Sequence, residues 1–214
     1  MHTTTRRIAC FCEKTFDAEI PDAIDLSLDE GVQDLILGGD FMAVTCPACG
    51  KRLTPEFPCV VSMAGEIPGA GGARDVLLVP ELDRVACLSG RHGGLKDGHA
   101  RVAIGMPELV EKVLIFSRSL DDRVVEIMKY YLLTGSAGSA AEDREVTLRY
   151  SGDEGERMVF HIAGLSEGQI GVARLGRDIY DRIQSDLATR LAEEPFSIFC
   201  DAPYVSIRKA ELAT

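Results

Sequence analysis

Four of the seven cysteines in this sequence lie in two close pairs. The first pair reads CFC at residues 10–12, and the second reads CPAC at residues 46–49. Zinc prefers four soft ligands arranged as a tetrahedron, and two pairs of thiolates on facing turns provide such a set. The spacing therefore predicts one zinc ion whose ligands are Cys10, Cys12, Cys46 and Cys49.

The same residues indicate a structural rather than a catalytic metal. A catalytic zinc ion normally keeps one coordination position for water, whereas four thiolates fill the shell. The nearest histidine, His2, lies at the N-terminus, where chains commonly fray. In the second pair, Pro47 fixes one backbone dihedral and Gly50 accepts the positive φ that a metal-binding turn often needs. The first pair has no proline and one spacer residue fewer.

An alternative interpretation treats the paired cysteines as reduced thiols buried like small hydrophobic residues. That interpretation suits Cys59, Cys87 and Cys200, because each lies alone in an apolar run. It gives no reason for two close pairs, so the metal site remains the leading prediction.

The cysteine content and the net charge indicate the compartment of the protein and the kind of partner it binds. Seven cysteines and no apolar run of signal-peptide length near the N-terminus predict reduced thiols in the cytoplasm. No segment is apolar for long enough to span a bilayer. The net charge is −11, and residues 1–58 hold five basic and ten acidic side chains. This balance disfavours nucleic acid as a partner of the chain or of its cysteine-rich part.

A short helix is predicted between the two cysteine pairs. Ser27 followed by Glu30 has the spacing of a capping box, and a glycine pair at 38–39 ends the pattern. Runs of β-branched and apolar residues predict three strands before residue 90 and three after residue 145. Those runs read FPCVVSM, DVLLVP and RVACLS, then VTLRY, RMVFHIAG and QIGVARL.

Helical periodicity is strongest in the middle of the chain. We predict helices over residues 107–117 and 120–133, with a break at residues 118–119. A third helix is predicted over residues 177–191, and the runs FSIFC and YVSIRK after it suggest a final hairpin.

The order of these elements predicts an α+β fold with antiparallel strands and grouped helices. We expect a zinc-ribbon-like module with a helical insert at residues 1–58 and strands followed by two helices at residues 59–133. A C-terminal α+β region is expected at residues 146–214, after a small, polar linker at residues 134–145.

The sequence resembles the CpXC family, a group of prokaryotic proteins named for two Cys-Pro-x-Cys motifs. The resemblance covers about residues 8–133 and rests on the two cysteine pairs and the segment LVEKVLIF…LDDRVVEIMKYYLL. The first pair departs from the family motif, because it lacks the proline and one spacer residue. The resemblance implies zinc-ribbon-like metal binding in a family without an assigned function.

Three functions follow from these observations. The leading hypothesis is a non-enzymatic interaction module, in which zinc staples a small ribbon and a protein partner or a second copy binds its surface. The alternative is a thiol redox sensor that releases zinc on oxidation, because the cysteine order also resembles the zinc site of redox-regulated heat-shock chaperones. An enzyme would need His92 and His99 to meet Asp97 in the stretch RHGGLKDGHA. The segment GAGGAR lacks the ending of a phosphate loop, so no nucleotide site is expected.

Overall fold

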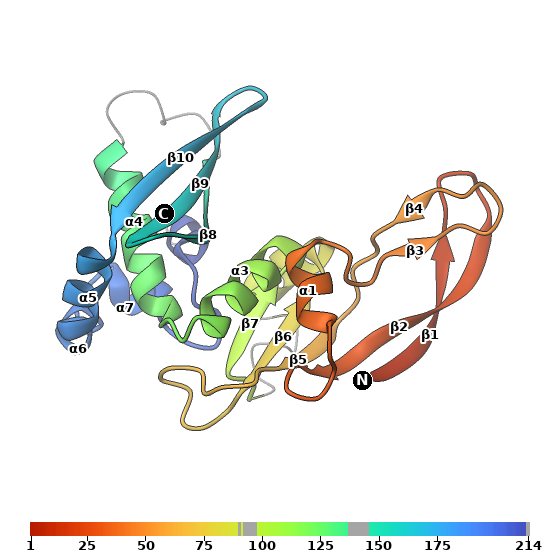
Figure 1. The fold of residues 1–214 in the computed structure, drawn as a ribbon, viewed down its shortest axis with the longest axis horizontal. Coiled ribbons are helices and arrows are strands. Elements are labelled where there is room, and N and C mark those ends of the chain that lie inside the picture. The colour runs from red at the N-terminus through yellow and green to blue at the C-terminus, as the bar shows by residue number, and fades with distance from the viewer. Residues whose placement is uncertain (90, 92–97, 137–145, 213–214) are drawn as a thin grey trace. The chain divides into compact units, whose positions relative to one another are not determined.

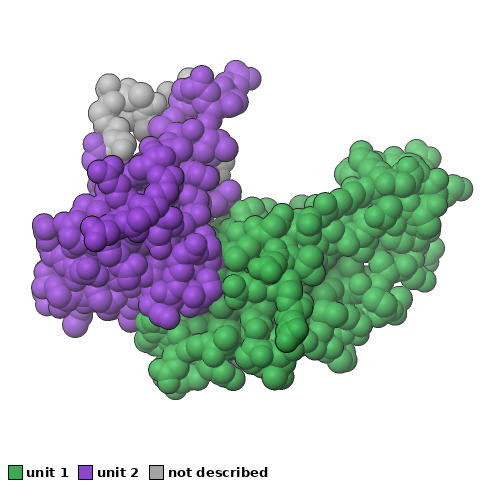
Figure 2. Space-filling model, in the orientation of Figure 1, with its two compact units in different colours: residues 1–113 green, residues 114–214 purple. Residues whose placement is uncertain are grey.

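The computed structural model describes residues 1–89, 91, 98–136 and 146–212. The chain divides into two compact units, Met1–Val113 and Leu114–Thr214, which Figure 2 colours separately. Each unit combines strands with helices (Figure 1), so the predicted α+β class is confirmed. None of the helices within the described residues is both long enough and apolar enough to cross a membrane.

Unit 1 is built on a five-stranded sheet with the order β1-β2-β5-β6-β7. Its strands are β1 (His2–Ala9), β2 (Thr15–Asp25), β5 (Cys59–Ser62), β6 (Asp75–Val79) and β7 (Arg101–Ile104). The pairs β1–β2 and β5–β6 are antiparallel, whereas β2–β5 and β6–β7 are parallel. The prediction of antiparallel strands alone is therefore wrong for this sheet. The reason is that long connections, such as residues 26–58, return the chain to the end of the sheet from which it started.

The connections of unit 1 carry short elements. These are α1 (Val32–Leu37), β3 (Val44–Thr45), β4 (Arg52–Leu53), the 3-10 turn η1 (Glu81–Asp83) and α2 (Arg84–Leu88). The predicted capping box is wrong, because α1 begins after Gly31 and the Ser27 N–H donates to Asp25 Oδ1 at 2.9 Å. The run RVACLS is α2 and not a strand. Cys87 is fully buried, whereas Val85 is 71 % exposed. A single helical turn that buries Cys87 is therefore enough to explain the apolar residues of this run.

The helix α3 (Met106–Ser117) begins directly after β7, and α4 (Asp122–Ser136) follows it. These bounds confirm the two helices predicted from apolar periodicity and the break between them. Ser119 adopts a positive φ of 54° within that break, which ends the first helical run. The apolar stripe predicted for α3 is also found, because Leu109 and Val113 are fully buried.

Unit 2 contains a three-stranded antiparallel sheet with the order β10-β9-β8. Its strands, β8 (Thr147–Glu154), β9 (Arg157–Ser166) and β10 (Gln169–Gly176), confirm the three predicted after residue 145. Four short helical elements follow, α5 (Arg177–Ser185), α6 (Leu187–Arg190), α7 (Phe196–Phe199) and the 3-10 helix η3 (Ile207–Leu212).

The predicted final hairpin is wrong. The run FSIFC forms α7, and the second run, residues 204–209, enters η3 rather than a strand. In α7, Phe196 and Phe199 lie three residues apart, so one helical turn buries both rings, with centroids 5.7 Å from each other. The predicted helix 177–191 is found as two helices, because the chain breaks at Asp186 between α5 and α6.

Candidate metal centre

Two tight hairpins of unit 1 carry the paired cysteines. Cys10 and Cys12 lie in the turn between β1 and β2, and Cys46 and Cys49 lie in the turn between β3 and β4. Figure 1 shows these hairpins side by side, in the red and orange part of the ribbon. The helix α1 and the strand β2 lie between the two turns in sequence, so the fold brings together residues that are more than thirty positions apart.

The four sulfur atoms form one compact cluster. Cys10 Sγ lies 3.6 Å from Cys49 Sγ, and Cys12 Sγ lies 3.7 Å from Cys46 Sγ. All four atoms lie within 4.8 Å of one another. A tetrahedral zinc ion with Zn–S bonds of about 2.3 Å separates its sulfur ligands by about 3.8 Å. The cysteines thus have the donor chemistry and the spacing of a four-thiolate metal site.

The backbone of each turn explains how two different spacings produce similar geometry. The Cys10 N–H donates to the Lys14 carbonyl at 2.9 Å, and the Cys46 N–H donates to the Lys51 carbonyl at 2.9 Å. The first turn is therefore one residue shorter, as its single spacer residue demands. Each turn also closes through one positive φ, of 65° at Glu13 and of 72° at Gly50. The absent proline and spacer in the first motif have not prevented its cysteines from joining the cluster.

Hydrogen bonds and burial give Cys10 and Cys46 different pKa values. The backbone N–H of Cys49 points at Cys46 and lowers the pKa of Cys46 to about 7, against the opposing effect of burial. The Cys12 N–H also lowers the pKa of Cys10, but burial and the neighbouring thiols outweigh it and raise this pKa to about 12. A metal that takes all four sulfurs as thiolates must therefore displace protons when it binds.

Each turn contributes one inner and one outer cysteine. Cys10 and Cys46 are buried, with 5 % and 1 % of their surface exposed, whereas Cys12 and Cys49 are exposed. Phe11, between the first two cysteines, is 83 % exposed, and the ammonium of Lys51 lies 4.7 Å from the centre of its ring. The cluster therefore lies at the surface of unit 1, with one exposed cysteine in each turn.

The remaining cysteines behave as buried hydrophobic residues. Cys59, Cys87 and Cys200 are all buried, and none of them belongs to the cluster. Burial raises the pKa of Cys59 to about 12, which keeps this thiol protonated and unreactive.

The partner of His99 in the structure is Asp75, which the enzyme hypothesis did not include. His99 Nδ1 hydrogen-bonds to Asp75 at the start of β6, and the Ala100 N–H donates to the same carboxylate at 3.2 Å. His92 and Asp97 lie outside the described residues. Burial alone would raise the pKa of Asp75, but these hydrogen bonds outweigh it and hold that pKa below its usual range. His2, the histidine nearest to Cys10 in sequence, pairs with Asp22 on β2.

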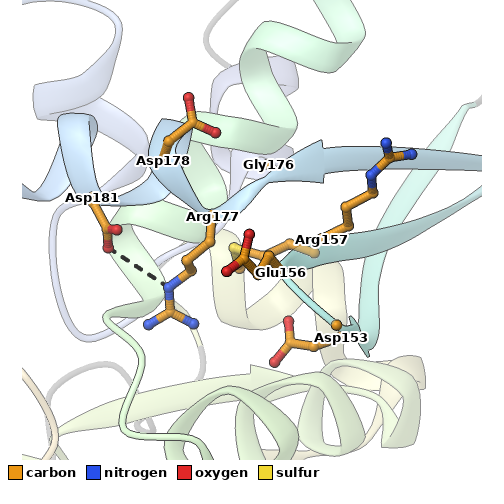
Figure 3. A pocket seen from close by; sticks show the side chains of 9 residues that line it. Asp153, Glu156, Arg157, Gly176, Arg177, Asp178 and Asp181 are labelled. Atoms are coloured by element: carbon orange, nitrogen blue, oxygen red, sulfur yellow. Dashed lines mark ion pairs between the residues drawn. The ribbon is translucent and has the colours of Figure 1, made fainter.

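Sequence reasoning missed a cavity in unit 2 of about 520 Å³, which Figure 3 shows. Charged side chains from the adjoining ends of β8 and β9, from the turn between them and from α5 line it: Asp153, Glu156, Arg157, Arg177, Asp178 and Asp181. Part of this charge is paired, because Arg177 lies 3.6 Å from Asp181, and Arg118, which does not line the cavity, lies 3.4 Å from Asp153. No short motif connects these segments, so the sequence carried no signal for the cavity. Among the described residues, the four cysteines are the one group that satisfies metal-ligand spacing.

Comparisons with known proteins place the chain in a family. The family model described as CpXC protein matches residues 8–129, a range that contains all four clustered cysteines. An uncharacterised protein of Treponema pallidum (strain Nichols) is 30 % identical over 200 residues, covering 84 % of this chain and 87 % of that protein. No solved structure matches the chain significantly. With more than half of its length matched, this chain belongs to the CpXC protein family.

Proposed function

We propose that this CpXC protein is a non-enzymatic interaction module that binds one structural zinc ion in a zinc-ribbon-like site. The ligands are Cys10, Cys12, Cys46 and Cys49, whose sulfur atoms all lie within 4.8 Å of one another. This single observation carries the proposal, because four thiolates at that spacing satisfy the tetrahedral preference of zinc.

The structural role follows from how little else supports the second hairpin. β3 and β4 contain two residues each, and they form a sheet of their own that is separate from the five-stranded sheet. A two-stranded hairpin of this size is marginal in water. A zinc ion that joins it to the longer β1–β2 hairpin would supply the missing folding free energy.

Four thiolates also argue against a catalytic metal, since they leave no coordination position for water. An interaction role suits the exposed residues around the site, above all Phe11 beside Lys51. We propose that residues 1–58 act as the zinc-binding module, and that the regions 59–133 and 146–214 follow it as separate parts of the chain. A reducing cytoplasm would keep the thiols available for metal, and the acidic chain would favour a protein partner over nucleic acid.

Cobalt substitution tests this proposal. Cobalt(II) bound by four thiolates in a tetrahedron absorbs strongly in the visible range and shows sulfur-to-metal charge-transfer bands in the near ultraviolet. We expect one equivalent of cobalt to produce both features and one equivalent of zinc to remove them. Weak absorption typical of octahedral cobalt, or no binding by folded protein, would contradict the proposed site.

A redox sensor is the second candidate, and the exposure of Cys12 and Cys49 favours it. Hydrogen peroxide would oxidise one thiolate to a sulfenic acid, and a neighbouring thiolate would then form a disulfide with release of hydroxide and of zinc. Mild peroxide should release zinc into a chromogenic chelator, and a reductant with added zinc should restore binding. Retention of zinc under peroxide would rule out the sensor and leave the structural role in place.

A further inference from the structure

The strand β1 occupies one edge of the five-stranded sheet, and β2 is its one strand neighbour among the described residues. Edge strands usually carry devices that prevent further pairing, such as short length, proline or lysine. β1 has eight residues, no proline and no lysine, and it contains three consecutive threonines at positions 3–5. Its charged side chains are Arg6 and Arg7, and its register irregularity lies at one end, between His2 and Thr3. The β-branched threonines favour an extended strand, so the backbone at this edge has the conformation needed to pair with another strand.

The hydrogen-bond pattern of the hairpin shows which backbone groups of β1 face outward. The Cys10 N–H donates toward the β2 side of the hairpin, to the Lys14 carbonyl. Backbone groups of an antiparallel strand alternate between its two sides. Arg6 and Ile8 therefore direct their N–H and C=O groups toward β2. Thr5 and Arg7 direct theirs away from the sheet, and the same alternation includes Thr3, because the register is regular from Thr3 to Ala9.

We infer that β1 pairs antiparallel with β1 of a second copy of this chain, with Thr5 opposite Thr5 across a two-fold axis. The outward groups of Thr3, Thr5 and Arg7 then face Arg7, Thr5 and Thr3 of the second copy, and each pair exchanges two hydrogen bonds. The two five-stranded sheets become one continuous sheet. This inference rests on the proposed interaction role and names the partner as another copy.

Among the registers that pair most of β1 and keep the buried and exposed faces of the two sheets continuous, charge selects this one. Moving the axis to Arg6 would place two guanidinium groups opposite each other. Moving it to Thr4 would bring Arg7 opposite the N-terminal ammonium of Met1. With the axis at Thr5, Arg6 meets Thr4 and Arg7 meets Thr3, so no like charges lie directly opposite.

The same register brings opposite charges together on the exposed face. Glu19 lies on β2 opposite Thr5, and its carboxylate accepts hydrogen bonds from the hydroxyls of Thr3 and Thr5. Arg7 is exposed and points to the same face of the hairpin. Placed opposite Thr3 of the second copy, Arg7 comes within reach of Glu19 of that copy. The two-fold axis produces this charge pair twice.

Sedimentation equilibrium of the full chain in a reducing, zinc-containing buffer tests the inference. We expect the apparent mass to rise with concentration toward twice the chain mass of 23.2 kDa. Thr5→Pro removes one outward N–H without touching the bonds to β2, and proline is tolerated at such edge positions. This variant should stay at the mass of one chain, whereas Thr5→Val keeps the N–H and should associate as the wild type does. Circular dichroism must show that both variants are folded.

A charge swap tests the register. Arg7→Glu should weaken association at least tenfold, because it places a second carboxylate near Glu19, and Arg7→Glu combined with Glu19→Arg should restore it. A wild type that keeps the mass of one chain at every concentration would overturn the inference, as would a dimer that folded Thr5→Pro leaves intact. Failure of the double variant to recover would overturn the Thr5 register.

Metal content measured on the same samples separates this inference from the proposed function. Zinc-loaded protein that never associates contradicts the dimer and leaves the zinc site standing. Protein that associates through β1 but contains no zinc contradicts the zinc site and leaves the dimer standing. Association with an extended segment of a different protein, in the absence of self-association, would also overturn the inference.

Discussion

Cys10 and Cys49 place their sulfur atoms 3.6 Å apart although they are 39 positions apart in the chain. The two cysteines come from different hairpins. The same kind of backbone hydrogen bond closes both turns, from the Cys10 N–H in the first and from the Cys46 N–H in the second. The contact therefore lies between the β1–β2 hairpin and the β3–β4 hairpin, and a metal bound there would link the two hairpins.

The positive φ in each turn leads to the first prediction. Gly50 has φ of 72°, so Gly50→Ala should strain its turn and lower the free energy of unfolding of the zinc form by about 1–2 kcal/mol. Glu13 has φ of 65° and carries a side chain that this conformation disfavours, so Glu13→Gly should be neutral or stabilising by up to about 1 kcal/mol. Thermal unfolding of the two zinc-loaded variants measures the difference. Equal destabilisation of both would contradict the described turns.

Glu56 connects the segment after the cysteine turns to two helical elements. Its Oε2 accepts the Glu81 N–H and its Oε1 accepts the Met106 N–H, both at 2.7 Å. Glu56→Gln keeps one acceptor oxygen and turns an amide N–H₂ toward the other donor. We expect a loss of about 1–3 kcal/mol in the free energy of unfolding, measured with urea. Glu66→Gln changes an exposed glutamate and should leave stability nearly unchanged. A matching loss in both variants would argue against this role of Glu56.

The third prediction concerns acid stability. Because hydrogen bonds hold the pKa of Asp75 below its unfolded value, the ionised carboxylate stabilises the fold above the unfolded pKa of about 3.9. That contribution is lost as the pH falls through the lower, folded pKa. Asp75→Asn should therefore reduce stability near neutral pH and flatten its decline in acid. Denaturation at several pH values measures both effects, with Asp17→Asn on the exposed face of β2 as the control. An unchanged acid limb in Asp75→Asn would refute the assignment.

The fourth prediction concerns a buried ion pair in unit 2. Lys129 Nζ lies 2.9 Å from Glu126 Oε1, and the two side chains are 4 % and 2 % exposed. Lys129→Met leaves the Glu126 carboxylate buried without this cation, which should cost about 3–5 kcal/mol. Removing both charges in Glu126→Gln/Lys129→Met should recover part of the loss. Urea denaturation compares these variants with Lys14→Met at an exposed position, and a similar loss in all three would contradict a special role for the pair.

The sequence predicted the elements whose residues carry a strong local pattern. The helices α3 and α4 have long apolar periodicities, and the strands β8, β9 and β10 have clear β-branched runs with turns between them. The clustering of the four cysteines was also predicted, because two close pairs of thiols are typical of a metal site. In each case the signal lies within a segment of about ten residues or in a motif with a single chemical purpose.

The failures share a physical cause as well. β1 is a polar strand with one buried side chain, Ile8, so alternation gave no signal, and its presence depends on pairing with β2. The five-residue helix α2 and the four-residue helix α7 are too short for period 2 and period 3.6 to be distinguished. Parallel pairing of β2 with β5 depends on where residues 26–58 carry the chain, which no local pattern encodes. The cavity of unit 2 likewise depends on segments that only the fold brings together.

Elemental analysis of protein purified without added metal tests whether the four cysteines bind zinc. We expect about one zinc per chain in the wild type and in Cys87→Ala, which alters a buried cysteine outside the cluster. Cys46→Ser/Cys49→Ser should contain no zinc and should lose hydrogen-exchange protection in the two cysteine hairpins while unit 2 stays folded. Well-folded wild type without zinc, or a double variant that retains it, would contradict the claim that these four cysteines form a zinc site.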